Sequence, residues 1–379
     1  MSGIYIHIPF CKKRCNYCDF YSECEPMYIP SYVEALKKQI ATCEPNEIDS
    51  VYIGGGTPSL LEGKQIDTLL TAVEERFTLK RDTEITIEVN PDSSSYEKLF
   101  AYKNAGVNRI SLGVQSAYDK TLKRLGRLHT NEQVVKALQD AVATGFTNIS
   151  GDIMLGLPNE KEREIDKTIR LLYENGVTHI SAYILKISED TPFGKNPPRN
   201  LPDDDTVATL YEFAAARLIS LGYDQYEISN FAKKSYESRH NKKYWNCEDY
   251  IGIGAGAYSS FKGKRYHIVP DIKRYIAYFN ELGKDTGSIS VNDGEVGWDD
   301  YMILRLRTNN GLSLNLLKER YTFTFSDNMK KMIKRYIKAG YINEHDDVIS
   351  LTRKGFLVSN EILAELMLAA ERTQHKKTD

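Results

Sequence analysis

Three cysteines near the start of the chain have the spacing needed to hold an iron–sulfur cluster. Cys11, Cys15 and Cys18 form the pattern C-x3-C-x2-C. Three thiolates can hold three corners of a [4Fe-4S] cube and leave the fourth iron without a protein ligand. An electron-transfer ferredoxin closes its cluster with four cysteines, whereas an open metal position is typical of a site that binds a reactive molecule. The sequence therefore predicts a cluster with one open iron.

The spacing of these cysteines, with Tyr17 directly before the last one, resembles the radical S-adenosylmethionine (SAM) superfamily. In that superfamily the free iron chelates the amino and carboxylate groups of SAM, and an electron from the cluster splits the sulfonium to give a 5'-deoxyadenosyl radical. The resemblance implies a [4Fe-4S] cluster, SAM and an electron donor. Cys24 is the less favoured candidate for a fourth ligand, and Cys43 and Cys247 are expected to be reduced thiols.

Polar or glycine-rich residues follow the next apolar segments, where they could hold SAM. Residues 54–58 read Gly-Gly-Gly-Thr-Pro, and glycines let a backbone approach a ligand closely. Glu88, Gln115, Arg127 and Asp152 stand at or after later segments. The carboxyl ends of barrel strands meet at one rim, so we expect these side chains to lie beside the cysteines.

The periodicity of apolar residues predicts alternating strands and helices, which is typical of βα units on a parallel sheet. Six such units fit an α/β fold with a partial, three-quarter (β/α)6 radical SAM barrel. A helix over about 203–221 and the segment 225–229 would close one side. The expected strands are 3–8, 50–53, 84–89, 109–114, 148–154 and 179–184, and the expected helices between them are 31–43, 65–77, 95–105, 131–144 and 161–175.

The pattern predicts a second, smaller domain. We expect domains 1–258 and 259–379, the second mostly helical and winged-helix-like, with a hairpin near 341–351 and a long terminal helix from Lys354. A basic stretch over 330–338 alternates with an apolar stripe. A solvated face over a packed stripe is the favoured interpretation, and docking to an acidic membrane surface or partner is the alternative.

Composition sets broad limits on function. The chain has 379 residues, of which 41% are hydrophobic, and its formal net charge of -2 argues against general nucleic-acid binding. No signal peptide or long apolar run is visible, so we expect a cytoplasmic protein, with peripheral association with a membrane left open.

Nearly the whole chain resembles one radical SAM family, the one that contains oxygen-independent coproporphyrinogen III oxidase and a branch of haem chaperones. The motifs are 5–11 (Tyr-Ile-His-Ile-Pro-Phe-Cys), 54–58, 111–116, 126–129 and 152–158. The resemblance implies contacts to a first SAM from Tyr5, Gly55 and Glu88. The positions that match a second SAM site of the oxidase are Tyr17, Gly56, Thr57, Gln115, Arg127 and Asp152.

Two departures distinguish this chain from the oxidases of that family. The oxidase pattern has a further cysteine one residue beyond the third, while this chain reads Cys18-Asp19-Phe20. The oxidases also carry a long arm before the cluster motif, which here begins almost at Met1. Both elements serve substrate handling in the oxidase, so porphyrinogen decarboxylation is put in doubt, and whether the chain is an enzyme stays open.

The chaperone branch has an H-N-x-x-Y-W signature, which residues 240–245 match. His240 is a candidate ligand for haem iron, because a neutral imidazole is a good axial ligand. We therefore expect a protein that binds haem and delivers it to haem-requiring apoproteins, with membranes as one implied location. The alternatives are oxidative decarboxylation of coproporphyrinogen III and radical chemistry on another substrate.

Overall fold

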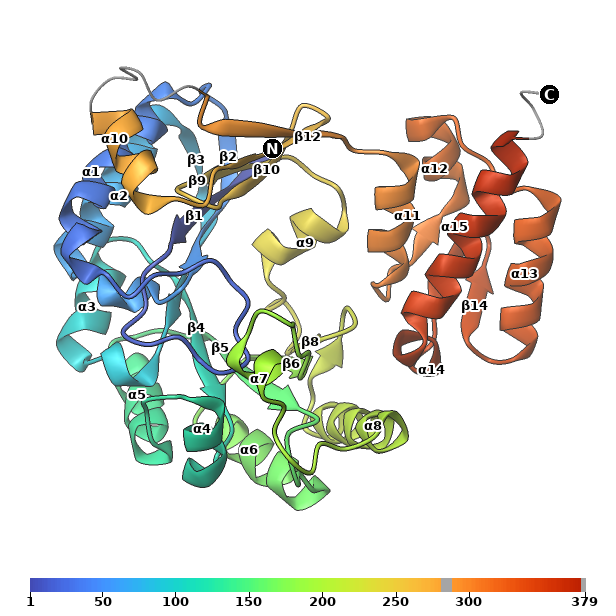
Figure 1. The fold of residues 1–379 in the computed structure, drawn as a ribbon, viewed down its shortest axis with the longest axis horizontal. Coiled ribbons are helices and arrows are strands. Elements are labelled where there is room, and N and C mark those ends of the chain that lie inside the picture. Colours follow the sequence, from blue (N-terminus) through green and yellow to red (C-terminus); the bar gives the residue numbers. More distant parts are fainter. Residues whose placement is uncertain (281–287, 376–379) are drawn as a thin grey trace.

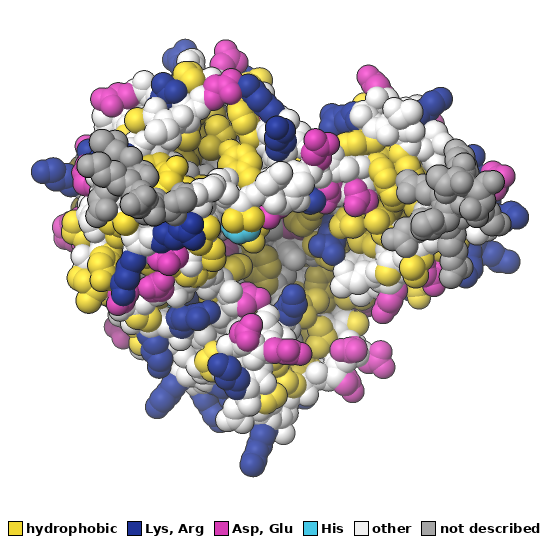
Figure 2. All heavy atoms as spheres, turned by 45° about the horizontal axis from the view of Figure 1, so that its top comes forward, with side chains coloured by type: hydrophobic (Ala, Val, Ile, Leu, Met, Phe, Trp, Pro, Cys, Tyr) yellow, Lys and Arg dark blue, Asp and Glu magenta, His cyan; other side chains and the backbone are white. Residues whose placement is uncertain are grey.

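The computed structural model describes residues 1–280 and 288–375. A curved sheet with helices on its outer side forms one unit, and a smaller, mostly helical unit follows it (Figure 1). Within the described residues, no helix is long and apolar enough to cross a membrane. Figure 2 shows acidic and basic side chains mixed over the visible surface, and a hollow between the two units that is lined largely by hydrophobic side chains.

Six parallel strands form the centre of the sheet and confirm the expected partial barrel. They pair in chain order, from β1 to β6, as expected for successive right-handed βα units. Their bounds are β1 Ser2–Ile8, β2 Glu47–Gly55, β3 Thr78–Val89, β4 Arg109–Gln115, β5 Asn148–Leu155 and β6 His179–Ile184.

Helices cover the outer side of the sheet and bury their apolar faces against it (Figure 1). On β1, Ile4, Ile6 and Ile8 are fully buried in the same core as Leu36 and Ile40 of α1. Successive strand residues point to opposite faces, so the other face of each strand lines the barrel interior. The helices that pack on this core are α1 Ile29–Thr42, α2 Gly63–Arg76, α3 Tyr96–Asn104, α5 Asn131–Ala143, α6 Glu162–Glu174 and α8 Asp204–Ser220. The short helices α4 Asp119–Leu125 and α7 Pro192–Lys195 contact the cysteine loop, where the Asn16 N–H donates to the Leu125 carbonyl and the Phe193 N–H donates to the Asn16 carbonyl.

Further strands extend the sheet at both edges. Beyond β6 lie β8 Asn230–Ala232 and β7 Asp224–Gln225, as expected for the closing segment. Beyond β1 lie β9 Tyr250–Ile253, β10 Tyr258–Phe261, β11 Lys264–Ile268 and β12 Ser290–Glu295. The expectation of a mostly helical chain after residue 259 is therefore wrong for this segment, where only α10 Ile272–Asn280 is helical among the described residues.

The expected domain division after residue 258 falls on the first residue of β10, inside the large sheet. The second core includes residues of the barrel edge, but its own elements begin with α11. We propose that the chain divides between Glu295 and Trp298. The elements after this point are α11 Trp298–Leu306, β13 Leu312–Ser313, α12 Leu314–Tyr321, α13 Asp327–Lys338, β14 Ile342–His345, β15 Val348–Leu351, α14 Arg353–Leu357 and α15 Ser359–His375.

The hairpin expected near 341–351 is present as β14 and β15, and β13 joins it to make a three-stranded sheet. The terminal helix expected from Lys354 is two helices, because the chain leaves the helical conformation at Val358. On α13, Met329 and Ile333 are buried while the basic positions are exposed. The packed stripe is therefore confirmed, and the choice between a solvated face and a docking face stays a prediction.

Candidate functional site

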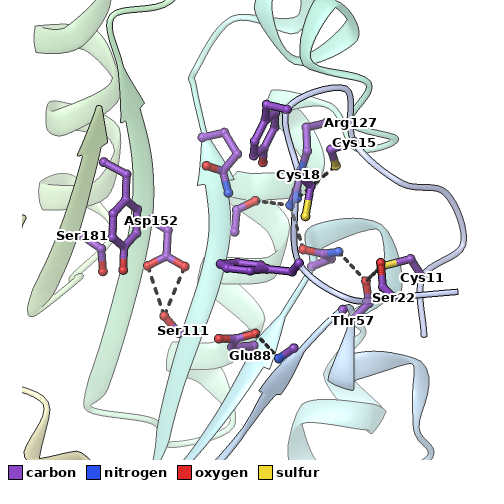
Figure 3. Close-up of a pocket in the computed structure, with 18 of the residues that line it drawn as sticks. Cys11, Cys15, Cys18, Ser22, Thr57, Glu88, Ser111, Arg127, Asp152 and Ser181 are labelled. Atoms are coloured by element: carbon purple, nitrogen blue, oxygen red, sulfur yellow. Dashed lines mark hydrogen bonds between the residues drawn. The ribbon is translucent and has the colours of Figure 1, made fainter. Parts of the chain in front are cut away.

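The three cysteines line one cavity of about 380 Å³ at the carboxyl ends of the barrel strands (Figure 3). Cys11 lies three residues beyond the end of β1 and is buried, while Cys15 and Cys18 are partly exposed, and all three are free thiols. Burial raises the pKa of the Cys11 and Cys18 thiols. Among the described residues, no group of three or more His, Cys, Asp or Glu side chains is gathered closely enough for a single metal ion.

A chain of hydrogen bonds joins Cys11 to Cys15 through residues of three different loops. The Thr57 hydroxyl donates to Cys11 Sγ at 3.5 Å and accepts from the Asn90 amide at 3.1 Å. Arg127 donates from Nη2 to Asn90 Oδ1 at 2.7 Å and from Nη1 to Cys15 Sγ at 3.7 Å. Donors aimed at sulfur stabilise thiolates and adjust the potential of a cluster, so this soft, hydrogen-bonded set fits an iron–sulfur cluster.

The glycine-rich run at the end of β2 lets the chain pass close beside the cysteine loop. A Cβ on Gly56 would lie 2.7 Å from the Phe10 carbonyl oxygen and 3.0 Å from Cys11 Sγ. Gly55 has a φ of 118°, which residues with a side chain rarely adopt. Gly56 is required because the two backbones approach closely there, and Gly55 is required because of its backbone conformation.

Glu88 projects from β3 into the cavity beneath the cysteine loop (Figure 3). Its Oε1 accepts the Tyr52 hydroxyl at 2.9 Å, and its Oε2 accepts the Gly55 N–H at 3.0 Å. Burial raises the pKa of Glu88 to about 7. The carboxyl can therefore change its charge near neutral pH and can receive a cationic amino group or a hydroxyl.

Asp152 lies across the cavity from the cysteine loop, on β5 (Figure 3). The Ser111 hydroxyl lies 3.2 and 3.3 Å from its two carboxylate oxygens, and burial raises its pKa. Gln115, at the end of β4, lines the same cavity with a φ of 64°, which is rare for a residue with a side chain. A strained residue on a cavity wall is consistent with a role in holding a ligand.

The cavity therefore brings together eleven of the thirteen site residues that the sequence predicts. The two that do not line it are Tyr5 and His240. Burial raises the pKa of Tyr17, which lies in the cavity beside Arg127. The eleven are Cys11, Cys15, Tyr17, Cys18, Gly55, Gly56, Thr57, Glu88, Gln115, Arg127 and Asp152.

Several further side chains line the cavity and were missed from the sequence. Asn90 and Arg109 lie two residues from Glu88 and Ser111, on or directly after the same strands, so counting alternate positions could have found them. Ser181 lies opposite Asp152 in the pairing of β5 with β6, a register that the sequence does not give. The missed residues are Tyr52, Asn90, Arg109, Ser181 and Tyr183.

Tyr5 faces a second cavity of about 640 Å³ on the neighbouring side of β1. Its hydroxyl lies 2.8 Å from Nδ1 of His7, whose Nε2 lies 3.1 Å from the Tyr21 carbonyl oxygen. Burial lowers the pKa of His7 to about 4, which makes it a neutral, hydrogen-bonded structural residue. Gly55 and Glu88 line both cavities, so Tyr5 remains close to the first one.

His240 is fully buried on α9 Arg239–Trp245, behind the barrel interior. Its Nδ1 lies 3.0 Å from Ser50 Oγ, and its Nε2 lies 2.8 Å from the Tyr244 hydroxyl. Burial lowers its pKa to about 3. Both ring nitrogens are thus engaged, and Tyr244, which lines the second cavity, lies against the ring with its own ring perpendicular.

Comparison with known proteins defines the class of this site. The model of the radical SAM superfamily matches residues 5–172, and the HemN C-terminal domain matches residues 298–358. A solved structure of coproporphyrinogen III oxidase (HemN) from Escherichia coli has the same fold, with a TM-score of 0.82 at 22% identity over 96% of this chain and 90% of that one. The fold and the cysteine site are those of a radical SAM protein, whose cofactors are a [4Fe-4S] cluster and SAM.

The curated relatives are more specific. "Heme chaperone HemW" of Bacillus subtilis is 34% identical, over 97% of this chain and 99% of its own length. The protein of the same name from Escherichia coli is 35% identical, over 97% and 98%. The chain belongs to the HemW family.

Proposed function

We propose that this protein is a haem chaperone, which binds haem and passes it to haem-requiring proteins. The observation that carries the proposal is the similarity over nearly the full length to proteins named heme chaperone HemW. The H-N-x-x-Y-W signature at 240–245 and the lack of a cysteine after Cys18-Asp19 support it. Oxidative decarboxylation of coproporphyrinogen III is not favoured, because the likeness to the solved oxidase concerns the fold.

We propose that Cys11, Cys15 and Cys18 hold the cluster, and that Thr57 and Arg127 orient two of its sulfur ligands. When bound, the reduced cluster supplies an electron that can cleave SAM. The first SAM would contact Tyr5, Gly55 and Glu88. The positions proposed for a second molecule are Tyr17, Gly56, Thr57, Gln115, Arg127 and Asp152.

His240 stays a prediction as a ligand of haem iron. Its Nε2 becomes available only if the Tyr244 hydroxyl moves away, because that hydroxyl occupies it at 2.8 Å. Lys243, within the same signature, is buried and paired with Asp49 at 2.8 Å and Glu248 at 3.2 Å, so it is not free to meet a haem propionate. It is therefore a structural residue in this conformation.

We propose that the acceptors are haem-requiring apoproteins that meet the chaperone in the cytoplasm or at a membrane surface. The exposed basic positions of α13 offer a face that an acidic surface could contact. A separate redox protein would have to reduce the cluster, since cleavage of SAM consumes an electron.

The experiment that tests the function is an anaerobic titration of the reconstituted protein with haem, followed by mixing with an apo-cytochrome. We expect saturable binding with a shifted Soret band, and then transfer of the haem to the acceptor. The same preparation, given SAM, reductant and coproporphyrinogen III, should form no protoporphyrinogen. Absence of saturable haem binding, or formation of protoporphyrinogen, contradicts the proposal.

A further inference from the structure

The contacts proposed for the first SAM explain the second cavity only in part. Tyr5, Gly55 and Glu88 line it, but its wall at β9, β10 and β11 is assigned neither to the cluster nor to SAM. Its volume of about 640 Å³ lies in the range of about 300–1,000 Å³ typical of small-molecule sites. It lies beside the inner face of the sheet at β1, β9, β10 and β11, and six aromatic rings contribute to its wall. They are Tyr5, Phe20, Tyr21, Tyr244, Tyr250 and Tyr258.

Such a wall is suited to a large, flat, aromatic ligand. Aromatic rings bury a large apolar area and pack well on another π-system. Tyr258 is 58% exposed, and the face of its ring that His267 does not cover is open to a ligand. Phe20 is 65% exposed and follows the last cysteine of the loop, so it contributes to both cavities.

His267 on β11 supplies an imidazole at this wall. Its ring stacks on that of Tyr258, with centroids 4.9 Å apart and planes 29° from parallel. Its Nδ1 lies 2.8 and 3.0 Å from the carboxylate oxygens of Asp293 on β12. A carboxylate at Nδ1 holds the proton there, and the lone pair of Nε2 is then directed away from the carboxylate and can bind a metal.

Three histidines lie at or near this cavity in the described part of the chain, and they differ in which nitrogens are occupied. His7 and His240 have hydrogen bonds at both ring nitrogens. For His267 the hydrogen bonds within residues 1–280 and 288–375 are at Nδ1, and its side chain is 20% exposed. His267 therefore offers an iron ligand without any rearrangement of the chain.

A cation lies on the same face of β11. Arg265 precedes His267 by two residues, so the two side chains point to one side of the sheet. The Arg265 side chain is 42% exposed and pairs with Asp300 of α11 at 2.6 Å. Arg265 does not line the cavity, whose charged lining residues are Asp19 and Glu88. Its charge nevertheless acts on the lining residue Tyr250. A carboxylate of the ligand at that edge of the cavity can replace Asp300 as the partner of Arg265.

We infer that the cavity is the site where haem first binds, with Nε2 of His267 as the axial ligand of the iron and Asp293 as its positioning residue. The inference rests on the proposed function, since it names where the cargo of a haem chaperone lies. The aromatic rings of the wall surround the porphyrin, and Tyr258, which is stacked on the His267 imidazole, presents its edge to the porphyrin. Arg265 exchanges Asp300 for a propionate. His240 remains behind Tyr244 during this first step.

The test is a titration of the full-length, cluster-reconstituted protein with ferric haem, measured by absorption and electron paramagnetic resonance. His267→Ala should weaken binding by roughly 10–100-fold and remove the spectral signature of histidine ligation. Asp293→Asn should weaken binding less and retain that signature. His345→Ala is the matched control, because His345 is exposed and has Asp346 Oδ2 at 2.9 Å from Nδ1, outside the cavity.

Added imidazole should restore the histidine-type spectrum to His267→Ala, which separates loss of a ligand from loss of the fold. If His267→Ala binds haem as tightly as the wild type, this inference is wrong, but the proposed chaperone function is not contradicted. Loss of binding in His240→Ala, with normal binding in His267→Ala, overturns it in favour of the signature motif. Failure of the wild type to bind haem instead contradicts the chaperone function itself.

Discussion

Glu88 is the residue whose environment most directly links protonation to ligand binding. It accepts hydrogen bonds from the Tyr52 hydroxyl and the Gly55 N–H, yet burial raises its pKa to about 7. Its negative charge is therefore stabilised only in part before a ligand arrives. A cationic group placed beside it would favour the ionised form and would lower its pKa.

We expect the affinity for SAM to rise with pH, because below about pH 7 Glu88 is protonated and lacks the charge that attracts an amino group. Between about pH 5.5 and about pH 7.5 the wild type should gain about tenfold in affinity, or about 1.4 kcal/mol. Glu88→Gln should bind about tenfold more weakly at the upper pH and show a flatter profile. Isothermal titration of the cluster-loaded protein measures both.

The matched control for this experiment is Glu160→Gln. Burial also raises the pKa of Glu160 to about 7, but its carboxylate accepts the N–H groups of Gly156 and Leu157 away from the cluster cavity. Its replacement should leave the pH profile of SAM binding as in the wild type. An unchanged profile in Glu88→Gln contradicts the role of Glu88.

The residues of the site differ in how well a sequence can predict them. The cysteines and the strand-end polar residues were predictable, because spacing along a loop and the common rim of a parallel sheet are local rules. The burial of His240 was not, because it depends on Ser50, which is 190 residues away, and on the seating of α9 against β2. A histidine in a polar motif gives no sign of such packing.

At the scale of elements, the end of β4 controls the position of Arg127. The Gly113 carbonyl accepts a hydrogen bond from Arg127 Nη2 at 2.8 Å. A Cβ on Gly113 would lie 2.7 Å from that nitrogen and 2.9 Å from Asn90 Oδ1. Both neighbours are ends of flexible side chains, so the backbone can keep its fold when they move. The hydrogen bonds that link Asn90, Arg127 and Cys15 would be broken by that movement.

We expect Gly113→Ala to keep the fold and the iron content but to weaken SAM binding by about tenfold, since Arg127 is displaced. Thermal unfolding should change by only a few degrees, which corresponds to about 1 kcal/mol. Gly297→Ala is a suitable control, because its new methyl would also meet a flexible side-chain end, Asp299 Oδ1, in the C-terminal unit. Equal SAM affinity in both variants contradicts the argument.

The elements themselves were largely predictable, and the exceptions have a physical reason. The six barrel strands are buried apolar segments and lie where periodicity placed them. β11 and β12 were missed because their sequences are mixed and polar, and β12 is an edge strand that is exposed throughout. Strands of this kind are defined by their pairing partners rather than by their own pattern.

At the scale of the whole molecule, the two units meet at the barrel edge formed by the loop between β7 and β8. The Ile228 N–H donates to the Arg307 carbonyl at 3.0 Å, and the Asn309 N–H donates to the Tyr226 carbonyl at 3.1 Å. Ile228 also packs against the C-terminal core. The C-terminal unit also contacts α9 through α11. The packing of this unit therefore supports the helix that carries the signature motif.

Glu227 lies at the centre of this junction. It forms an isolated antiparallel bridge with Thr308, and its side chain is fully buried. Its Oε2 accepts the Ser229 N–H at 3.1 Å, and Asn230 lies close enough to stabilise its charge. Burial raises the pKa of Glu227 to about 7.

The pKa of Glu227 is higher in the native state than in the unfolded state. Between these two pKa values the native state therefore binds more protons than the unfolded state. The free energy of unfolding should therefore fall as pH rises from about 4.5 to about 7 and stay low above that. Glu227→Gln removes this dependence. The difference in free energy of unfolding between the variant and the wild type should therefore be roughly 2–3 kcal/mol larger, in favour of the variant, at about pH 8 than at about pH 5. Urea unfolding of both proteins at the two pH values measures this increase, and exposed Glu344→Gln should show none. If Glu227→Gln also shows none, the carboxyl is solvated or paired in solution, and the junction is looser than the buried contacts of Glu227 indicate.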